Sequence, residues 1–377
     1  MILMTRNMKN LTFLTKTPVR VELAITNRCN LHCTYCSHFT SARDVGRDLT
    51  KKEWLQFFKE LNRCAVMSLT LEGGEPFCRD DLRELIDGIV QNRMRYTILS
   101  NGTLINDKTA SYLASTHRCN GVQVSIDGST PETHDAFRGE GSFSKALNGV
   151  KLLKAQGVPV FVRVTIHKQN LKDLKKIAKL LFEEIGLSGF STNSASFMGF
   201  CRQNADEVQL SVEERTLAMA TLLELQKKYK GRISADAGPL ADATNWIEME
   251  QLKREKRGRN RRGGFLTGCN GPMFKIGVRA DGVIVPCLHL SHIVLGEINK
   301  DDLKDIWQNH NELIKLRQRK NIPLGDFRFC KACDYINYCT GNCPALSYTI
   351  LGTVNHPSPD ACLRRFLQSG GKLPDNR

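Results

Sequence analysis

The chain alternates short apolar runs with amphipathic segments from about Pro18 to Ile233, and this alternation limits the fold more than any other feature. Six runs have the length and composition of buried strands: Val19–Ile25, Val66–Leu71, Tyr96–Ser100, Val122–Ile126, Val160–Ile166 and Gly189–Ser194. Because helical segments separate them, the strands are expected to be parallel, with right-handed crossovers. The sequence therefore predicts an α/β fold, a partial (β/α)6 barrel of the TIM type, whose active site gathers at the carboxyl ends of the strands.

The segments between the strands carry the helical signals. Amphipathic periodicity is present over Lys51–Asn62, Arg79–Gln91, Asp107–Ser115, Ser142–Gln156 and Leu171–Glu184. Thr50 and Asn106 directly precede two of these segments and are expected to be N-caps, because their side chains accept hydrogen bonds from the first helical turn. A further helix is expected over Ser211–Lys228.

The pattern becomes less regular toward the Gly263-Gly264 pair, where we place a domain boundary. We divide the chain into an N-terminal extension (1–17), a barrel core (18–240), a basic linker (241–264) and a cysteine-rich domain (265–377). The last part has short elements and a hairpin signal at Asp281-Gly282 but little continuous apolar pattern. Its folding is therefore expected to need metal.

The chain is basic, with 54 Lys and Arg residues against 39 Asp and Glu and a net charge of +15. Part of this charge lies in the run Lys253–Arg262, which we interpret first as a solvated linker and second as a docking surface for an acidic partner. No aromatic residue interleaves with the run, so nucleic acid is not the expected partner. The apolar runs are too short for a membrane span, and the N-terminus lacks a signal peptide, so we expect a cytoplasmic protein with no membrane partner.

Cysteine spacing carries the chemical information. Of the 14 cysteines, three lie between residues 29 and 36 and seven between residues 269 and 362. The other four, Cys64, Cys78, Cys119 and Cys201, are scattered and are expected in the core. Disulfides are not expected, because the cytoplasm keeps thiols reduced.

The first group, Cys29, Cys33 and Cys36, follows the first predicted strand with the spacing C-x3-C-x2-C. A [4Fe–4S] cluster normally takes four cysteines, so three leave one iron open to an outside ligand. Zinc is the alternative, but this spacing fits the paired ligands of zinc sites poorly. We therefore interpret the loop as an iron–sulfur site.

With Tyr35 before its last cysteine, the loop resembles that of the radical S-adenosylmethionine (SAM) superfamily, and the resemblance extends over residues 20–365. It implies that the three cysteines hold the cluster that binds SAM. Further positions that resemble SAM contacts follow the next strands: Gly73, Gly74, Glu75, Pro76, Asn101, Ser125, Asp127 and Arg138. In the superfamily the Gly-Gly-Glu-Pro motif binds the amino group of SAM, and an arginine placed like Arg138 reaches its carboxylate in related peptide-modifying enzymes. The alternatives are a tight turn at Gly73-Gly74 and a surface ion pair between Arg138 and Asp135.

The second group resembles the seven-cysteine SPASM domain, which implies two auxiliary clusters and a total of three [4Fe–4S] clusters. Gly282, Pro286, Leu295–Ile298 and Trp307 match its connecting segments. By the resemblance, four cysteines hold an outer cluster: Cys330, Cys333, Cys339 and Cys362. Three hold an inner one: Cys269, Cys287 and Cys343. The fourth inner iron is then open or takes another residue such as Cys201, and a zinc ribbon is the alternative for the outer group.

One position departs from the resemblance. Anaerobic sulfatase maturases of this group have an Asp directly after the cysteine that corresponds to Cys287, and this chain has Leu288. Formylglycine formation by that route is therefore not expected. If the reaction needs a base, His289 is the nearest candidate, although we interpret it first as a histidine packed beside the cluster or exposed to solvent.

The resemblance implies an enzyme that cleaves SAM reductively to a 5′-deoxyadenosyl radical and removes hydrogen from a substrate. Its expected substrate is a ribosomally made peptide, changed by a cross-link, an oxidation or an epimerisation. The expected partners are that peptide, a separate leader-binding protein, and an electron donor such as ferredoxin or flavodoxin. The alternatives are a small-molecule dehydrogenase, a porphyrin side-chain modifying enzyme, an RNA modifier and a non-catalytic electron carrier.

Overall fold

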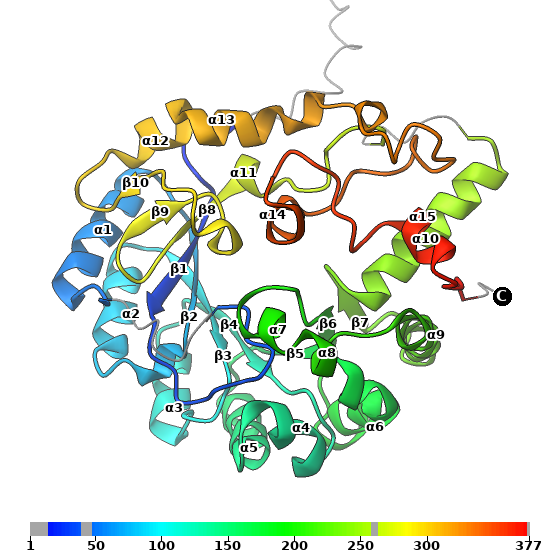
Figure 1. Cartoon of the computed structure of the whole chain (residues 1–377). Coiled ribbons are helices and arrows are strands. Elements are labelled where there is room, and N and C mark those ends of the chain that lie inside the picture. Colours follow the sequence, from blue (N-terminus) through cyan, green and yellow to red (C-terminus); the bar gives the residue numbers. More distant parts are fainter. Residues whose placement is uncertain (1–13, 39–46, 258–262, 375–377) are drawn as a thin grey trace, which may run out of the picture.

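The computed structural model describes residues 14–38, 47–257 and 263–374, and these form one continuous sheet surrounded by helices (Figure 1). The strands of this part of the chain are β1 (Arg20–Thr26), β2 (Ser68–Gly73), β3 (Arg95–Ser100), β4 (Cys119–Ser125), β5 (Val160–Ile166), β6 (Phe190–Ser194), β7 (Ile233–Ala235), β8 (Lys275–Val278), β9 (Val283–Val285) and β10 (Gly296–Glu297). Their order in the sheet is β10-β9-β8-β1-β2-β3-β4-β5-β6-β7.

All six strands predicted from the sequence are present, and each pairs in parallel with its neighbour. The predicted partial barrel is therefore confirmed, with β7 added in parallel beyond β6. Alternation along β1 places Val21, Leu23 and Ile25 in the core, whereas Glu22 is only half-buried and belongs to the opposite face.

The helices lie outside the sheet, where α1 to α6 form an arc in Figure 1. Those before the C-terminal domain are α1 (Lys51–Arg63), α2 (Leu82–Gln91), α3 (Asp107–Ser115), α4 (Pro131–Arg138), α5 (Ser142–Ala155), α6 (Leu174–Lys179), α7 (Gly199–Gln203), α8 (Ala205–Val208), α9 (Val212–Lys228) and α10 (Pro239–Arg254). The predicted N-caps are confirmed, since Thr50 accepts from Glu53 N and Asn106 from Thr109 N. Two 3-10 helices, η1 (Pro76–Cys78) and η2 (Lys168–Asp173), and a π-helix, η3 (Leu180–Glu184), complete this part.

The C-terminal domain is not separate from the barrel sheet. Its first strand, β8, pairs in parallel with β1, from Arg20 opposite Lys275 to Leu23 opposite Val278. β9 and β10 then continue the sheet in antiparallel fashion, which confirms the predicted hairpin at Asp281-Gly282. Its helices and turns are α11 (Gly271–Phe274), η4 (Leu288–Leu290), α12 (Leu303–Asn309), α13 (Asn311–Gln318), η5 (Arg319–Asn321), η6 (Leu324–Asp326), α14 (Pro344–Leu351) and α15 (Leu363–Gln368).

The segment expected to be a linker differs from that expectation. Residues 241–254 belong to α10, because Ala243, Trp246 and Met249 recur at helical spacing and are buried. Trp246 packs against Phe366 of α15, with ring centroids 4.9 Å apart. Residues 241–254 are therefore helical, whereas the described residues of the basic run, 253–257, are exposed or half-buried, and residues 258–262 lie outside the described part of the chain. The domain boundaries themselves stay predictions.

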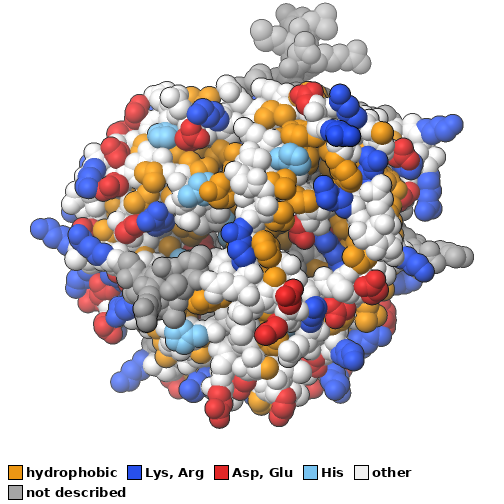
Figure 2. All heavy atoms as spheres, viewed as in Figure 1, with side chains coloured by type: hydrophobic (Ala, Val, Ile, Leu, Met, Phe, Trp, Pro, Cys, Tyr) orange, Lys and Arg blue, Asp and Glu red, His pale blue; other side chains and the backbone are white. Residues whose placement is uncertain are grey.

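Among the described residues, no helix combines the length and apolarity that crossing a membrane requires. Lys and Arg side chains are spread over the face seen in Figure 2 with acidic side chains between them.

Candidate active site

The loop after β1 carries the first three cysteines, and the residues after β2 hold it in place. Gly74 N donates to Thr26 O, and Glu75 N donates to Arg28 O, both at 2.8 Å. A Cβ on Gly74 would lie 2.2 Å from Arg28 O, so only glycine allows this approach. Gly73 adopts a φ of +126°. The Gly-Gly-Glu motif thus joins the cysteine loop to the second strand. An ordinary tight turn, the alternative considered for Gly73-Gly74, would not make these contacts.

Glu75 is buried, with 1% of its surface exposed. Its carboxylate accepts from Ser100 Oγ at 2.8 Å, Asn101 N at 2.7 Å and Phe77 N at 3.2 Å. Burial raises the pKa of Glu75 to about 7, against the opposing effect of these hydrogen bonds. An unpaired carboxylate in such a place is suited to a cationic or hydrogen-bond-donating ligand, which the SAM amino group would supply.

Asn101 lies beside the same loop. Its Nδ2 donates to Asn30 Oδ1 at 2.9 Å, between the first two cysteines, and its Oδ1 accepts from Thr103 N at 2.9 Å. Asn101 thus orders the cysteine loop from the end of β3 and also donates its backbone N–H to Glu75.

Arg138 is buried and pairs with Asp127, so the alternative of a surface ion pair with Asp135 was wrong. Arg138 Nε lies 2.5 Å from Asp127 Oδ2, and Nη1 lies 4.0 Å from Cys33 Sγ. Tyr35 also donates to Asp127 Oδ2. Burial alone would raise the pKa of Asp127, but the Arg138 charge, two nearby histidines and the Tyr35 hydrogen bond together hold it below its usual value. Asp135 instead accepts from Phe143 N at 2.7 Å at the start of α5.

Polar side chains also line the barrel interior, and the sequence analysis did not single them out. Glu22 and Lys275 form an ion pair across β1 and β8. Burial raises the pKa of Glu72 to about 7, with the Glu22 charge as a second cause, while Lys275 and Arg163 oppose the shift. Ser125, predicted as a SAM contact, is opposite Arg163 in the register of β4 and β5. These interior side chains have a signal in the sequence, which is a polar residue at alternate positions of an otherwise apolar strand.

The seven C-terminal cysteines separate into the two predicted groups. Burial raises the pKa of Cys339 to about 12, and the charges of three neighbouring thiols contribute to this shift: Cys362, Cys330 and Cys333. In the other group, the charges of Cys269 and Cys287 act on Cys343. Figure 1 shows the chain of this domain lying across the open side of the barrel, near α14.

These groups have the chemistry that an iron–sulfur cluster requires. Burial and neighbouring thiolates raise the pKa of Cys29 to about 12 and that of Cys33 to about 11, so the ionised thiols need a cation. Backbone N–H groups point at several sulfurs, as from Gly271 to Cys269 at 3.3 Å and from Gly341 to Cys339 at 3.4 Å. Groups of three and four thiols of this kind fit iron–sulfur clusters, which take cysteine thiolates as their ligands.

Three further positions were considered in the sequence analysis, and each has different surroundings: His289, Leu288 and Cys201. His289 is exposed, and its Nδ1 lies 3.9 Å from Cys287 Sγ. Leu288 faces Gly277 of β8, whose added Cβ would lie 3.1 Å from Leu288 Cγ. Cys201 is fully buried in an apolar cluster with Tyr35, Phe137, Ala195 and Val208, and no thiol of the inner group acts on its pKa. It is a core residue rather than a natural fourth ligand.

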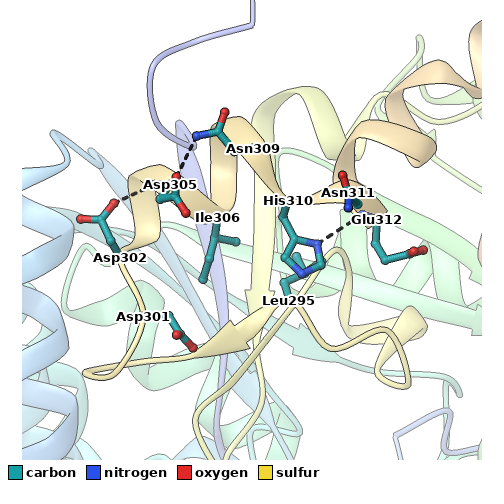
Figure 3. Close-up of a pocket in the computed structure, with 9 residues that line it drawn as sticks. All are labelled: Leu295, Asp301, Asp302, Asp305, Ile306, Asn309, His310, Asn311 and Glu312. Atoms are coloured by element: carbon teal, nitrogen blue, oxygen red, sulfur yellow. Dashed lines mark hydrogen bonds between the residues drawn. The ribbon is translucent and has the colours of Figure 1, made fainter.

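A surface pocket of about 450 Å³ lies elsewhere, over α12 and α13 (Figure 3). Its carboxylates serve local structure: Asp302 caps α12, and Asp305 accepts from Asn309 Nδ2 at 2.7 Å. No cysteine lines it, so it is not part of the site described above.

Comparison with known proteins agrees with this geometry. Residues 23–181 match the radical SAM superfamily, and residues 269–334 match an iron–sulfur cluster-binding domain, SPASM. The chain is 28% identical to an AdoMet-dependent heme synthase from Methanosarcina barkeri, over 92% of this chain and 97% of that enzyme. It is 25% identical to a PqqA peptide cyclase from Granulibacter bethesdensis, over 92% and 87% of the two chains.

The fold is also similar to a crystal structure of Streptococcus suis SuiB bound to its precursor peptide SuiA. The TM-score is 0.70 at 16% identity, covering 93% of this chain and 77% of that one. Three of the predicted ligands, Cys339, Cys343 and Cys362, lie beyond the matched SPASM segment, yet the structure groups them with those inside it. The chain is therefore a radical SAM enzyme, with a radical SAM domain over residues 23–181 and a C-terminal iron–sulfur cluster-binding SPASM domain.

Proposed function

We propose that this enzyme modifies a ribosomally made peptide. The observation that carries the proposal is the similarity to enzymes named for their action on peptides, and the polar side chains of the inner strand faces are compatible with such a substrate. Glu22, Glu72, Arg163 and Lys275 provide both charges there, as a peptide with backbone and side-chain polar groups requires. PqqA peptide cyclases and a mycofactocin maturase from Mycobacterium tuberculosis, at 26% identity, are among its relatives.

The proposed site residues have separate roles. Cys29, Cys33 and Cys36 hold the cluster to which SAM binds, while Glu75 and Arg138 orient the amino and carboxylate groups of SAM. When bound, the cluster and SAM supply a radical able to remove hydrogen from an unactivated carbon. Gly73, Gly74, Pro76 and Asn101 fix the loop, and Ser125 and Asp127 define the adjoining wall.

The C-terminal cysteines hold two further [4Fe–4S] clusters in this proposal, three in total. The change made to the peptide is a cross-link, an oxidation or an epimerisation. Formylglycine formation is not proposed, because Leu288 offers no base beside Cys287. We place the reaction in the cytoplasm, where thiol ligands stay reduced.

The proposed partners follow from charge. The end of α10 and the residues after it are basic and exposed, at Arg254, Lys256 and Arg257. Lys253 contacts Asp334 in the outer cysteine loop at 2.8 Å. Lys and Arg side chains lie at the right edge of Figure 2, where α10 ends. An acidic electron donor of the ferredoxin or flavodoxin class would dock there, near the outer cluster. A separate protein would present the leader of the peptide.

A second candidate is the modification of a porphyrin side chain. The observation that favours it is the match over 97% of the length of the Methanosarcina barkeri heme synthase. Both substrates present carboxylates and apolar surface, so the barrel interior alone does not choose between them.

The test is anaerobic reconstitution with SAM and a reductant, followed by mass spectrometry. Candidate precursor peptides, an iron porphyrin and a sulfatase-type Cys or Ser peptide are incubated in parallel. A mass change in a precursor peptide that grows with 5′-deoxyadenosine supports the proposal. A change only in the porphyrin selects the second candidate, and aldehyde formation in the sulfatase-type peptide contradicts the argument from Leu288.

A further inference from the structure

Arg319 is a buried arginine at the start of η5, directly after α13. Only 2% of its surface is exposed. Its Nε donates to the backbone oxygen of Val354 at 2.8 Å. Val354 belongs to a small apolar cluster with Leu290, Leu316 and Ala345, against which Cys287 and Cys343 also pack. The guanidinium is therefore anchored to a residue that packs on the same apolar cluster as two cysteines of the inner group.

The charge of Arg319 has no carboxylate partner among the described residues. None of the ion pairs found there includes this arginine. Its Nη2 is buried and has no hydrogen-bond partner within the described part of the chain. A buried charge without a counter-ion is strongly unfavourable, so a group with negative charge is needed in this space.

The thiolates of Cys269 and Cys343 are the acidic groups that act on Arg319. Burial lowers the pKa of its guanidinium, and the charges of these two thiolates oppose the shift. A guanidinium keeps its proton under such conditions. The side chain thus supplies a fixed positive charge, with free N–H donors, next to the inner cysteine group.

We propose that Arg319 is the counter-ion of the inner auxiliary cluster and raises the reduction potential of that cluster. An oxidised four-iron cluster with three thiolates already carries a net negative charge, and reduction adds a second. A buried cation stabilises the more negative state, and hydrogen bonds to cluster sulfur act in the same direction. This inference rests on the proposed function, in which the inner cluster accepts the electron that a substrate radical gives up.

The outer group has different surroundings. Arg364 and Arg365 act on Cys330, but they are partly exposed and lie over the ring of Phe329, 4.8 and 4.4 Å from its centroid. Solvent screens such charges, so their influence on a potential is weaker. The geometry therefore predicts that the inner cluster is the better electron acceptor of the two.

The experiment is an anaerobic redox titration followed by electron paramagnetic resonance. It uses the full chain with Cys29, Cys33 and Cys36 replaced by Ala, so that only the auxiliary clusters contribute. The midpoint that disappears on Cys287→Ala is assigned to the inner cluster. In Arg319→Gln we expect this midpoint potential to fall by at least 59 mV, which is a tenfold change in a one-electron reduction equilibrium. The outer midpoint is the internal reference and stays in place.

Arg319→Lys keeps the charge and should retain most of the wild-type potential. Arg317→Gln is the matched control, because Arg317 lies on the same segment over the Trp307 ring at 4.5 Å and no thiolate acts on it. An unchanged inner midpoint at full iron content in Arg319→Gln overturns the proposal, as does an equal shift of both midpoints. Loss of the inner cluster in the Gln variant but not the Lys variant supports the counter-ion role. Loss in both shows a packing role and overturns it.

This titration needs no substrate. A failed search for a peptide substrate would leave its result intact, so the failure of one proposal is distinguishable from the failure of the other.

Discussion

At the scale of single residues, the site depends on charges that are buried without water. Asp127 is fully buried between Arg138, Tyr35 and the backbone N–H of Thr165, which donates at 2.6 Å. Such a pair fixes geometry more than it adds stability, because desolvation offsets much of the Coulombic gain. Its consequence is a guanidinium held in one orientation beside Cys33.

Arg138→Lys should weaken SAM binding while the iron content stays at the wild-type level. Lysine keeps the positive charge that Asp127 requires but loses the fork that holds a carboxylate through two parallel bonds. The expected loss is about 1.5–3 kcal/mol of binding free energy. Equilibrium binding of SAM to the reconstituted enzyme measures it. Wild-type affinity in this variant would assign Arg138 a structural role alone.

Glu75 should make the cluster-free protein less stable as the pH rises. Its pKa is about 7 when folded against 4.5 for the free side chain, so the folded state binds more protons between these values. Unfolding free energy therefore falls from pH 4.5 to 7, by about 3 kcal/mol from this group. Glu75→Gln should remove most of this fall. Denaturant unfolding of the metal-free barrel, followed by a signal from the barrel at pH 5 and pH 8, tests it, and an equal fall of the unfolding free energy in both proteins would refute it.

At the scale of elements, the cysteine loop is positioned by the strand next to it. The spacing of Cys29, Cys33 and Cys36 and the motif at Gly73–Glu75 were both visible in the sequence, because each follows an apolar run. The pairing of Arg138 with Asp127 was not, because it joins α4 to the end of β4 and no local pattern encodes it. Arg319 belongs to no motif, and only its burial distinguishes it.

Gly74→Ala should disrupt the first cluster. The new Cβ would meet Arg28 O at 2.2 Å, so the loop that begins with Cys29 must move. We expect SAM cleavage to be lost and iron to fall by up to about four atoms per chain. Gly325→Ala is the control, because nothing lies within 4 Å of a Cβ there. Full iron content and activity in Gly74→Ala would show that the loop adapts.

The element boundaries that the sequence analysis missed have physical causes. Residues 241–254 were expected to belong to a linker because the pattern becomes less regular toward the basic run, yet Trp246 and its neighbours pack on α9 and α15. The pairing of β8 with β1 joins residues about 250 positions apart, which periodicity cannot indicate. The six strands of the barrel were predictable because each is a buried apolar run between turn signals.

At the scale of the whole molecule, the cysteines define the metal content. The wild-type chain should hold about 11 to 12 irons after anaerobic reconstitution, from three four-iron clusters. Replacing Cys29, Cys33 and Cys36 with Ala should remove about four of them and abolish SAM cleavage. Iron and zinc analysis by mass spectrometry gives both numbers. About four irons together with bound zinc would contradict the auxiliary clusters.

The shared sheet has a consequence for how such a protein can change. Because β8 completes the edge of β1, whose far end leads into the loop of Cys29, the two cofactor-binding regions are parts of one mechanical frame. A cysteine-rich tail borrowed from a relative would have to supply a matching edge as well as matching thiols. Exchange of this region between enzymes therefore requires a strand that pairs with β1 in the right register before the cysteines can matter. New activities would arise more easily from changes to the side chains that line the barrel.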